Sequence, residues 1–176
     1  MAGRREKVIE RFAKQFGWKR GAELGVWKGR TFKYLLTTVP NLHLIGVDLY
    51  AAQPENTGPE TWTPGENGHP WNHEHYYKDL MQFCKTTNGR GTIMRMKTND
   101  AANLIEDESL DFVFIDADHS YEGCNADIVN WSPKVKKGGY VMGHDIFWED
   151  VNKAIRENFG DDFHEEEDKV WWHKKK

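Results

Sequence analysis

Two short segments of this 176-residue chain combine carboxylates with imidazoles, and each follows an apolar run. Asp116 and His119 come after the run FVFI, and His144 and Asp145 come after YVMG. Two carboxylates held side by side either share a proton or bind a cation. Oxygen ligands with room for water favour a hard ion such as Mg²⁺. A cation held there can bind a substrate hydroxyl and lower its pKa, and His119 is placed to take the proton.

Other polar residues stand at the ends of the remaining apolar runs. Glu23 and Gly25 lie in GAELGV, Asp48 ends the run LHLIGVD, and Asn99 and Asp100 follow GTIMRMK. Each of these alone is common as a turn former or a cap. Acidic or amide residues after five successive runs indicate instead a shared site.

The elements that would position these residues alternate between strand and helix. Apolar residues at helical spacing predict helices over 4–16, 31–38, 73–87, 99–107, 121–136 and 147–159, with Asn99 as the N-cap of the fourth. Short apolar runs predict strands over 21–26, 42–49, 91–97, 109–117 and 138–145, followed by two short strands or a hairpin within 163–174. This alternation predicts an α/β protein with a parallel sheet covered by helices. In such sheets, ligands bind beyond the carboxyl ends of the strands.

The segment 51–72 is different, because it is rich in Pro and Gly and lacks periodicity. It predicts a long loop, and long loops in compact domains are commonly functional lids. The chain is 13% aromatic with a mean hydropathy of −0.80. We therefore expect a set of rings on this loop and around the site to stack on a sugar or flat acceptor: Trp62, Trp71, Tyr76, Tyr77, Phe147 and Trp148.

Composition narrows the classes of partner. Lys and Arg number 24 against 28 Asp and Glu, for a net charge of −4, which gives no electrostatic reason to expect nucleic acid. Two cysteines do not make a disulfide framework. No run reaches the roughly 20 apolar residues of a membrane span, and the N-terminus lacks the apolar core of a signal peptide. We expect one cytoplasmic domain over 1–176, with no membrane partner.

The turn after the first strand bears on the cofactor. It reads GVWKG from Gly25 to Gly29, whereas a nicotinamide dinucleotide fingerprint reads GxGxxG. Glycines there let the backbone approach a ligand, and the helix that follows can hold an anionic group. Asp48, at the end of the next strand, is placed to accept hydrogen bonds from ribose hydroxyls. A nicotinamide-dependent oxidoreductase and a non-catalytic cofactor-binding module are alternatives. The missing fingerprint disfavours the first, and a base beside two carboxylates disfavours the second.

Five segments of the chain resemble class I S-adenosylmethionine-dependent methyltransferases: AELGVWKGRTFKYLL, LIGVDLY, MKTNDAANLI, DFVFIDADHSYEGCNADIVNW and KKGGYVMGHD. The likeness covers about residues 18–160. It is strongest to the small branch with sugar and macrolide O-methyltransferases and cephalosporin-hydroxylase-like proteins. The resemblance implies a Rossmann-like three-layer sandwich. Its mostly parallel seven-stranded sheet would have the order 3-2-1-4-5-7-6 and an antiparallel last strand.

The resemblance also implies roles for individual residues. The methionine part of S-adenosylmethionine would lie among the residues of the first turn, its ribose on Asp48 and its adenine at Asn99 or Asp100. The implied cofactor set is Glu23, Gly25, Trp27, Gly29, Asp48, Asn99, Asp100 and Asp116. The implied metal set is Asp116, Asp145 and His144. The family has an acidic pair where this chain has His144-Asp145, so a weaker or softer metal preference is an alternative to Mg²⁺.

The activity expected is methyl transfer from S-adenosylmethionine to a hydroxyl oxygen of a small molecule or sugar, with divalent-metal help. Asp116 and His119 would be catalytic. The acceptor would be recognised by the loop 51–72, which would act as a lid, and by the segment after His144. The oligomeric state stays open, with a homo-oligomer as one alternative.

Overall fold

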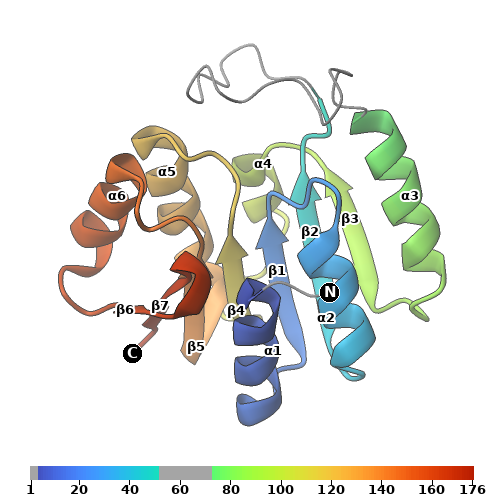
Figure 1. The fold of residues 1–176 in the computed structure, drawn as a ribbon, viewed down its shortest axis with the longest axis horizontal. Helices are drawn as coiled ribbons and strands as arrows, with labels where there is room; N and C mark the ends of the chain where they lie inside the picture. The colour runs from blue at the N-terminus through green and yellow to red at the C-terminus, as the bar shows by residue number, and fades with distance from the viewer. Residues whose placement is uncertain (1–3, 52–72) are drawn as a thin grey trace.

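The computed structural model describes residues 4–51 and 73–176, and its elements follow the predicted alternation (Figure 1). The helices are α1 (Arg4–Phe16), α2 (Arg30–Thr38), α3 (His73–Lys85), α4 (Thr98–Ala102), α5 (Tyr121–Trp131) and α6 (Glu149–Phe159), with 3₁₀ turns η1 (Ser132–Lys134) and η2 (Glu167–Lys169). The strands are β1 (Arg20–Leu24), β2 (His43–Asp48), β3 (Gly91–Arg95), β4 (Leu110–Ile115), β5 (Val135–Gly143), β6 (His164–Glu165) and β7 (Trp171–Lys174). The predicted loop and lid, with Trp62 and Trp71, falls outside the described residues except for Ala51.

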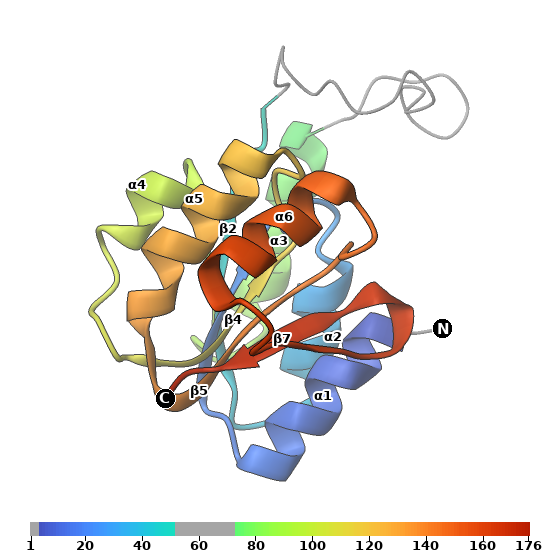
Figure 2. The ribbon, with the colours of Figure 1, turned by 90° about the vertical axis from the view of Figure 1, so that its left-hand side faces the viewer.

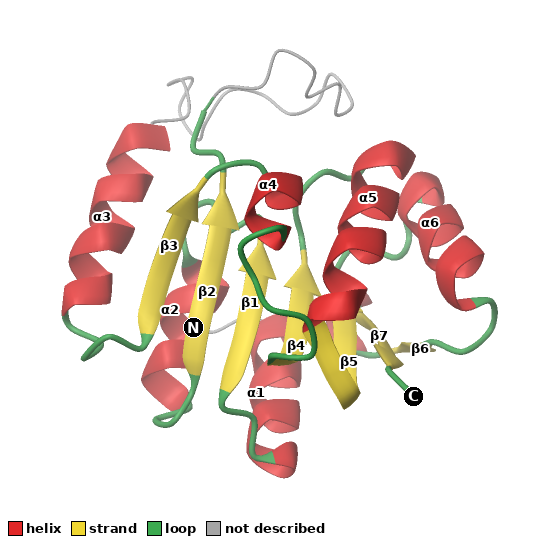
Figure 3. Ribbon diagram, turned by 180° about the vertical axis from the view of Figure 1, so that it is seen from behind, coloured by secondary structure: helices red, strands yellow, loops and turns green. Residues whose placement is uncertain are grey.

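The seven strands form one sheet of order β3-β2-β1-β4-β5-β7-β6, as the resemblance implied. Strands β1 to β5 are parallel, β7 is antiparallel to β5, and β6 is antiparallel to β7. The carboxyl ends of β1, β2, β3 and β4 therefore meet at one edge of the sheet (Figure 3). No helix in the described part of the chain combines the length and apolar character needed to span a membrane.

Three layers are visible when the sheet is seen edge-on (Figure 2). One face packs against α1, α2 and α3 through Phe112 and Phe114 of β4. The other packs against α4, α5 and α6 through Val113 and Ile115 of the same strand. All six residues of β4 are buried, which explains why its apolar residues run without alternation.

Several predicted boundaries are wrong. The helix predicted to run to residue 136 ends at Trp131, because Pro133 has no N–H to continue it, and β5 begins at Val135 instead of 138. The fourth helix begins at Thr98 with Lys97 as its N-cap, so Asn99 lies inside it.

Much of the aromatic excess is core. Trp18 stacks on Phe112 with ring centroids 4.5 Å apart, in a cluster with Phe12, Tyr140 and Trp172 beneath α1. Tyr76 and Tyr77, which the sequence analysis places at the acceptor site, also pack partly against this core. Phe147 differs, because 61% of its surface is exposed.

Candidate active site

Two carboxylates and an imidazole converge where β4 and β5 end. Ile115 and Gly143 are register partners at the ends of these parallel strands, so Asp116 and His144 follow side by side. The main chain of His144 donates to the carbonyl of Ile115 at 3.0 Å, which continues the ladder by one residue. Asp145 then adopts a left-handed conformation with φ 59°. Ligand atoms of Asp116, His144 and Asp145 all lie within 4.8 Å of one another, close enough to hold one cation.

His144 is oriented by a main-chain acceptor. Its Nε2 lies 2.7 Å from the carbonyl oxygen of Asp168, and since a carbonyl only accepts, Nε2 carries a proton. This leaves Nδ1 facing the carboxylates, 3.1 Å from Oδ2 of Asp145 and 3.6 Å from Oδ1 of Asp116. Burial opposes the charged ring, but the two carboxylates raise the pKa of His144 to about 9. Backbone orientation of the far nitrogen is typical of histidines that bind metals.

His119 lies in the loop after β4 and contacts the same carboxylates. Its Nε2 is 2.9 Å from Oδ2 of Asp145 and 3.8 Å from Oδ1 of Asp116. Burial acts to lower its pKa, but these carboxylates raise it above the ordinary histidine value. Burial would likewise raise the pKa of Asp145, and hydrogen bonds from His119 and His144 hold it well below its usual range. Asp145 is therefore the accepting partner in both contacts.

Arg5 belongs to α1, and its side chain contacts this cluster. The sequence does not predict this residue as part of the site. Its Nη1 donates to Oδ2 of Asp116 at 2.9 Å and lies 3.4 Å from Nδ1 of His144. The main-chain N–H of Arg5 donates to Oδ2 of Asp168 at 3.0 Å. One signal in the sequence could have pointed to Arg5. A basic residue in the first turn of a helix is disfavoured by the helix dipole, so its presence there indicates a stabilising partner elsewhere.

Glu23 lies within β1, one residue before its end, and is 3% exposed. Burial, and then the charge of Asp116, raise its pKa well above the ordinary carboxyl value. Its Oε2 has no hydrogen-bond partner among the described residues. A buried oxygen without a partner suits a donor brought by a ligand, such as an ammonium group.

Asp48 joins the first turn to the end of β2. Its Oδ2 accepts from the main-chain N–H of Trp27 at 2.7 Å, and its Oδ1 accepts from that of Tyr50 at 2.8 Å. Both donors have left-handed backbones, with φ near 48° and 47°. Each carboxylate oxygen has a further lone pair, so Asp48 can still accept from a ribose.

The glycines of the first turn are needed for packing within the protein. A Cβ on Gly25, which has φ +80°, would stand 2.1 Å from the carbonyl oxygen of Asp116. One on Gly29, which has φ +72°, would stand 2.3 Å from Leu80. Between them Trp27 is 39% exposed, and Nζ of Lys28 lies 4.3 Å from its ring centroid.

The other predicted cofactor residues lie on α4. Asn99 and Asp100 are both exposed, in the first turn of that short helix. Oδ1 of Asn99 accepts from Nδ2 of Asn130 on α5 at 3.0 Å. The two residues thus stand four and five positions beyond the end of β3, whereas the predicted strand over 91–97 ends two positions before Asn99.

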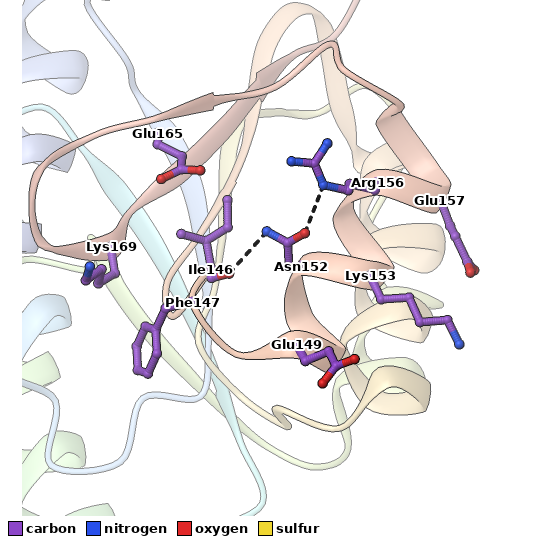
Figure 4. A pocket seen from close by; sticks show the side chains of 9 residues that line it. All are labelled: Ile146, Phe147, Glu149, Asn152, Lys153, Arg156, Glu157, Glu165 and Lys169. Carbon is purple, nitrogen blue, oxygen red and sulfur yellow. Dashed lines mark hydrogen bonds between the residues drawn. The ribbon is translucent and has the colours of Figure 1, made fainter.

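A cavity of about 670 Å³ lies between α6 and the segment around η2 (Figure 4). Its lining includes Ile146 and Phe147, directly after Asp145, and Glu149, Asn152, Lys153, Arg156, Glu157, Glu165 and Lys169. Asp116, His119 and Asp145 are not among its lining residues. Ile146 and Phe147 thus connect the cavity to the carboxylate cluster in sequence, but the carboxylates themselves do not line the cavity.

A family profile described as a methyltransferase domain matches residues 22–146. The chain belongs to this methyltransferase-domain family. The match runs from within β1 to just past Asp145, so it spans the first turn, Asp48 and the carboxylate cluster. The resemblance to class I S-adenosylmethionine-dependent methyltransferases is thereby confirmed.

Solved structures share the fold of this methyltransferase domain. A proposed caffeoyl-CoA O-methyltransferase from Staphylococcus aureus has a TM-score of 0.69 at 13% identity, over 98% of this chain and 83% of the other. A calicheamicin methyltransferase has a TM-score of 0.66 at 17% identity, over 98% and 80%. An O-methyltransferase from Bacillus cereus, in complex with SAH, has a TM-score of 0.63 at 11% identity, over 98% and 81%.

One curated relative matches about half of this chain. The uncharacterized protein y4gI of Sinorhizobium fredii (strain NBRC 101917 / NGR234) is 28% identical over 89 residues. The match covers 49% of this chain and 9% of that protein, so this chain spans only a small share of its relative's length.

Proposed function

We propose that this protein transfers a methyl group from S-adenosylmethionine to a hydroxyl oxygen of a small molecule or sugar, with a divalent cation as helper. The observation that carries the proposal is the convergence of Asp116, His144 and Asp145, whose ligand atoms lie within 4.8 Å of one another. Gly25 of the first turn packs directly against the backbone of Asp116, so the proposed cofactor and cation residues adjoin.

The first turn and β2 supply groups suited to the cofactor. The buried, unpartnered oxygen of Glu23 would accept from the ammonium of the methionine part. Asp48 would accept from the ribose hydroxyls, and Asn99 or Asp100 would meet the adenine edge. The cofactor itself supplies an activated methyl group on sulfur. The similar fold of a Bacillus cereus O-methyltransferase that binds SAH supports this assignment.

The carboxylates and histidines would handle the acceptor hydroxyl. Asp116 and Asp145, with Nδ1 of His144 once deprotonated, would hold a divalent cation, and that cation would supply Lewis-acid activation of the acceptor oxygen. Mg²⁺ is the first choice for the carboxylates, and the imidazole broadens the choice to Mn²⁺. His119 would take the hydroxyl proton at Nε2 as the new carbon–oxygen bond forms and the sulfur–carbon bond breaks. Because Nε2 donates to Asp145 in this structure, the base role requires that Nε2 first lose its proton and that Asp145 turn to the cation instead.

Exposed rings beside the cluster would receive the acceptor. Phe147 follows Asp145 closely, is 61% exposed and lies 5.9 Å from the ring of Trp148. Trp148 lies 5.8 Å from the ring of His119, which links this aromatic pair to the proposed base. Rings of this kind stack on sugars and flat molecules.

The test is methyl transfer itself. The full chain is incubated with S-adenosylmethionine labelled in its methyl group and with a panel of sugar and small-molecule hydroxyl acceptors, in Mg²⁺, Mn²⁺ or a chelator. We expect label in an ether product of at least one acceptor, and loss of that product in the chelator. Equal product with and without the chelator would refute the role of the cation. Label only on nitrogen or carbon would refute the acceptor class.

A further inference from the structure

One guanidinium lies on the same groups that form the proposed cation site. Nη1 of Arg5 is 2.9 Å from Oδ2 of Asp116 and 3.4 Å from Nδ1 of His144. Arg5 thus contacts two of the three side chains whose ligand atoms converge. It reaches them from α1, which is far from both strands along the chain.

At His144, the contact with Arg5 and the binding of a cation exclude each other. Nε2 of His144 is committed to the carbonyl of Asp168, so only Nδ1 of this ring can bind a cation. In this structure Nδ1 donates to Asp145 and lies 3.4 Å from the guanidinium of Arg5, so a cation at Nδ1 would require both the loss of that proton and the displacement of the guanidinium. At Asp116, a divalent cation would meet the positive charge of the guanidinium at short range and be repelled.

The main chain of Arg5 is anchored while its side chain has room to move. Its N–H donates to Asp168, and α1 is held in the core through Val8, Ile9 and Phe12. The side chain is 23% exposed, so the guanidinium can rotate into solvent without moving the helix. The dipole of α1 disfavours a positive charge at this end, so the carboxylates are what hold the guanidinium there.

We propose that Arg5 is a built-in counter-cation of the site, which sets its affinity for divalent cations by competing for Asp116 and His144. This inference rests on the proposed function, because it requires the cation site. Arg5 is a positioning residue, since it touches the ligands and not the acceptor. Removal of the Arg5 side chain should therefore strengthen cation binding. If Arg5 only supported the structure of the site, its removal would weaken cation binding.

The test measures binding of Mn²⁺ alone to the full chain, by calorimetric titration at one pH after removal of metals with a chelator. Arg5→Ala should bind Mn²⁺ about tenfold more tightly than the wild type, the worth of one charge-assisted hydrogen bond. Arg5→Lys keeps the charge and should restore most of the competition. Arg11→Ala is the matched control. Arg11 lies on the same helix and pairs with Glu166 near η2, so its loss should leave Mn²⁺ affinity unchanged.

Wild-type or weaker affinity in Arg5→Ala overturns the inference, and so does failure of both proteins to bind Mn²⁺. If Arg5→Ala does not fold, Arg5→Gln replaces it, because glutamine keeps a donor without the charge, and the same gain is expected. Asp116→Asn separates the inference from the proposed function. Undiminished binding in Asp116→Asn shows that the cation site is wrong. Lost binding there, with no gain in Arg5→Ala, refutes only the role of Arg5.

Discussion

Gly25 and Asp116 lie so close that no side chain fits between them. A Cβ on Gly25 would stand 2.1 Å from the carbonyl oxygen of Asp116 and 2.7 Å from Cα of Ala117. The turn proposed to hold the cofactor is thus packed against the start of the loop that carries Asp116 and His119. In the proposed reaction, this contact fixes the distance between the methyl donor and the groups that hold the acceptor.

Gly25→Ala should therefore be more damaging than an ordinary glycine substitution. It combines a left-handed backbone with a clash against main-chain atoms, and we expect the free energy of unfolding to fall by about 3 kcal/mol. Gly89→Ala is the matched control, because Gly89 has φ +77° and nothing within 4 Å of the added Cβ. It should cost only about 1 kcal/mol. Equal losses in urea unfolding would show that the contact with Asp116 is unimportant.

Asp127 on α5 should make stability fall with rising pH. It is 2% exposed, and burial, opposed by a hydrogen bond from Thr98, raises its pKa to about 7. The folded protein therefore keeps a proton that the unfolded chain releases near pH 4, so this stabilisation is full below pH 4 and is lost as pH rises through 7. Asp127→Asn removes the effect. Relative to the wild type, the variant should gain about 2 kcal/mol in unfolding free energy between pH 5 and pH 8.

The matched control for that series is Asp107→Asn, an exposed carboxylate paired with Lys134. It should track the wild type at both pH values. A constant difference between Asp127→Asn and the wild type would mean that Asp127 is already ionised in the folded protein.

Asp48→Ala should weaken cofactor binding. The substitution removes the acceptor for the N–H groups of Trp27 and Tyr50, both of which have left-handed backbones, as well as the proposed ribose acceptor. We expect affinity for S-adenosylhomocysteine to fall at least about tenfold, measured by calorimetry. Asp107→Ala should bind like the wild type. Unchanged affinity in Asp48→Ala would remove Asp48 from the cofactor site.

Phe147→Ala should affect the acceptor and not the cofactor. The ring is exposed beside Asp145 and supports little of the core, so the fold should tolerate its loss. Once an acceptor is found, we expect its KM to rise severalfold while S-adenosylhomocysteine affinity stays constant. The opposite pattern would contradict the aromatic acceptor site. The same experiment at Trp62 and Trp71 tests the acceptor role predicted for those rings.

Apolar runs in the sequence reveal where the strands end, and the strand order that brings Asp116 beside Asp145 comes from the resemblance to methyltransferases. The sequence misplaces the end of α5, because the apolar pattern continues to Val135 whereas Pro133, which has no N–H, ends the helix before it. It also assigns Tyr77 to the acceptor site; that ring packs against Tyr50 with centroids 5.4 Å apart, and its acceptor role stays a prediction. Arg5 could not be placed, because its partner Asp116 lies 111 residues away and no local pattern links them.

The central claim is that one sheet edge holds both a methyl donor and a divalent cation, and that Asp116 is needed for the cation. Its most direct test is calorimetric titration of the wild type and of Asp116→Ala with S-adenosylhomocysteine and with Mg²⁺ or Mn²⁺. The account predicts that the wild type binds both, and that Asp116→Ala keeps the cofactor product while losing the cation. A wild type that does not bind S-adenosylhomocysteine, or an Asp116→Ala protein that binds the cation as the wild type does, would contradict it.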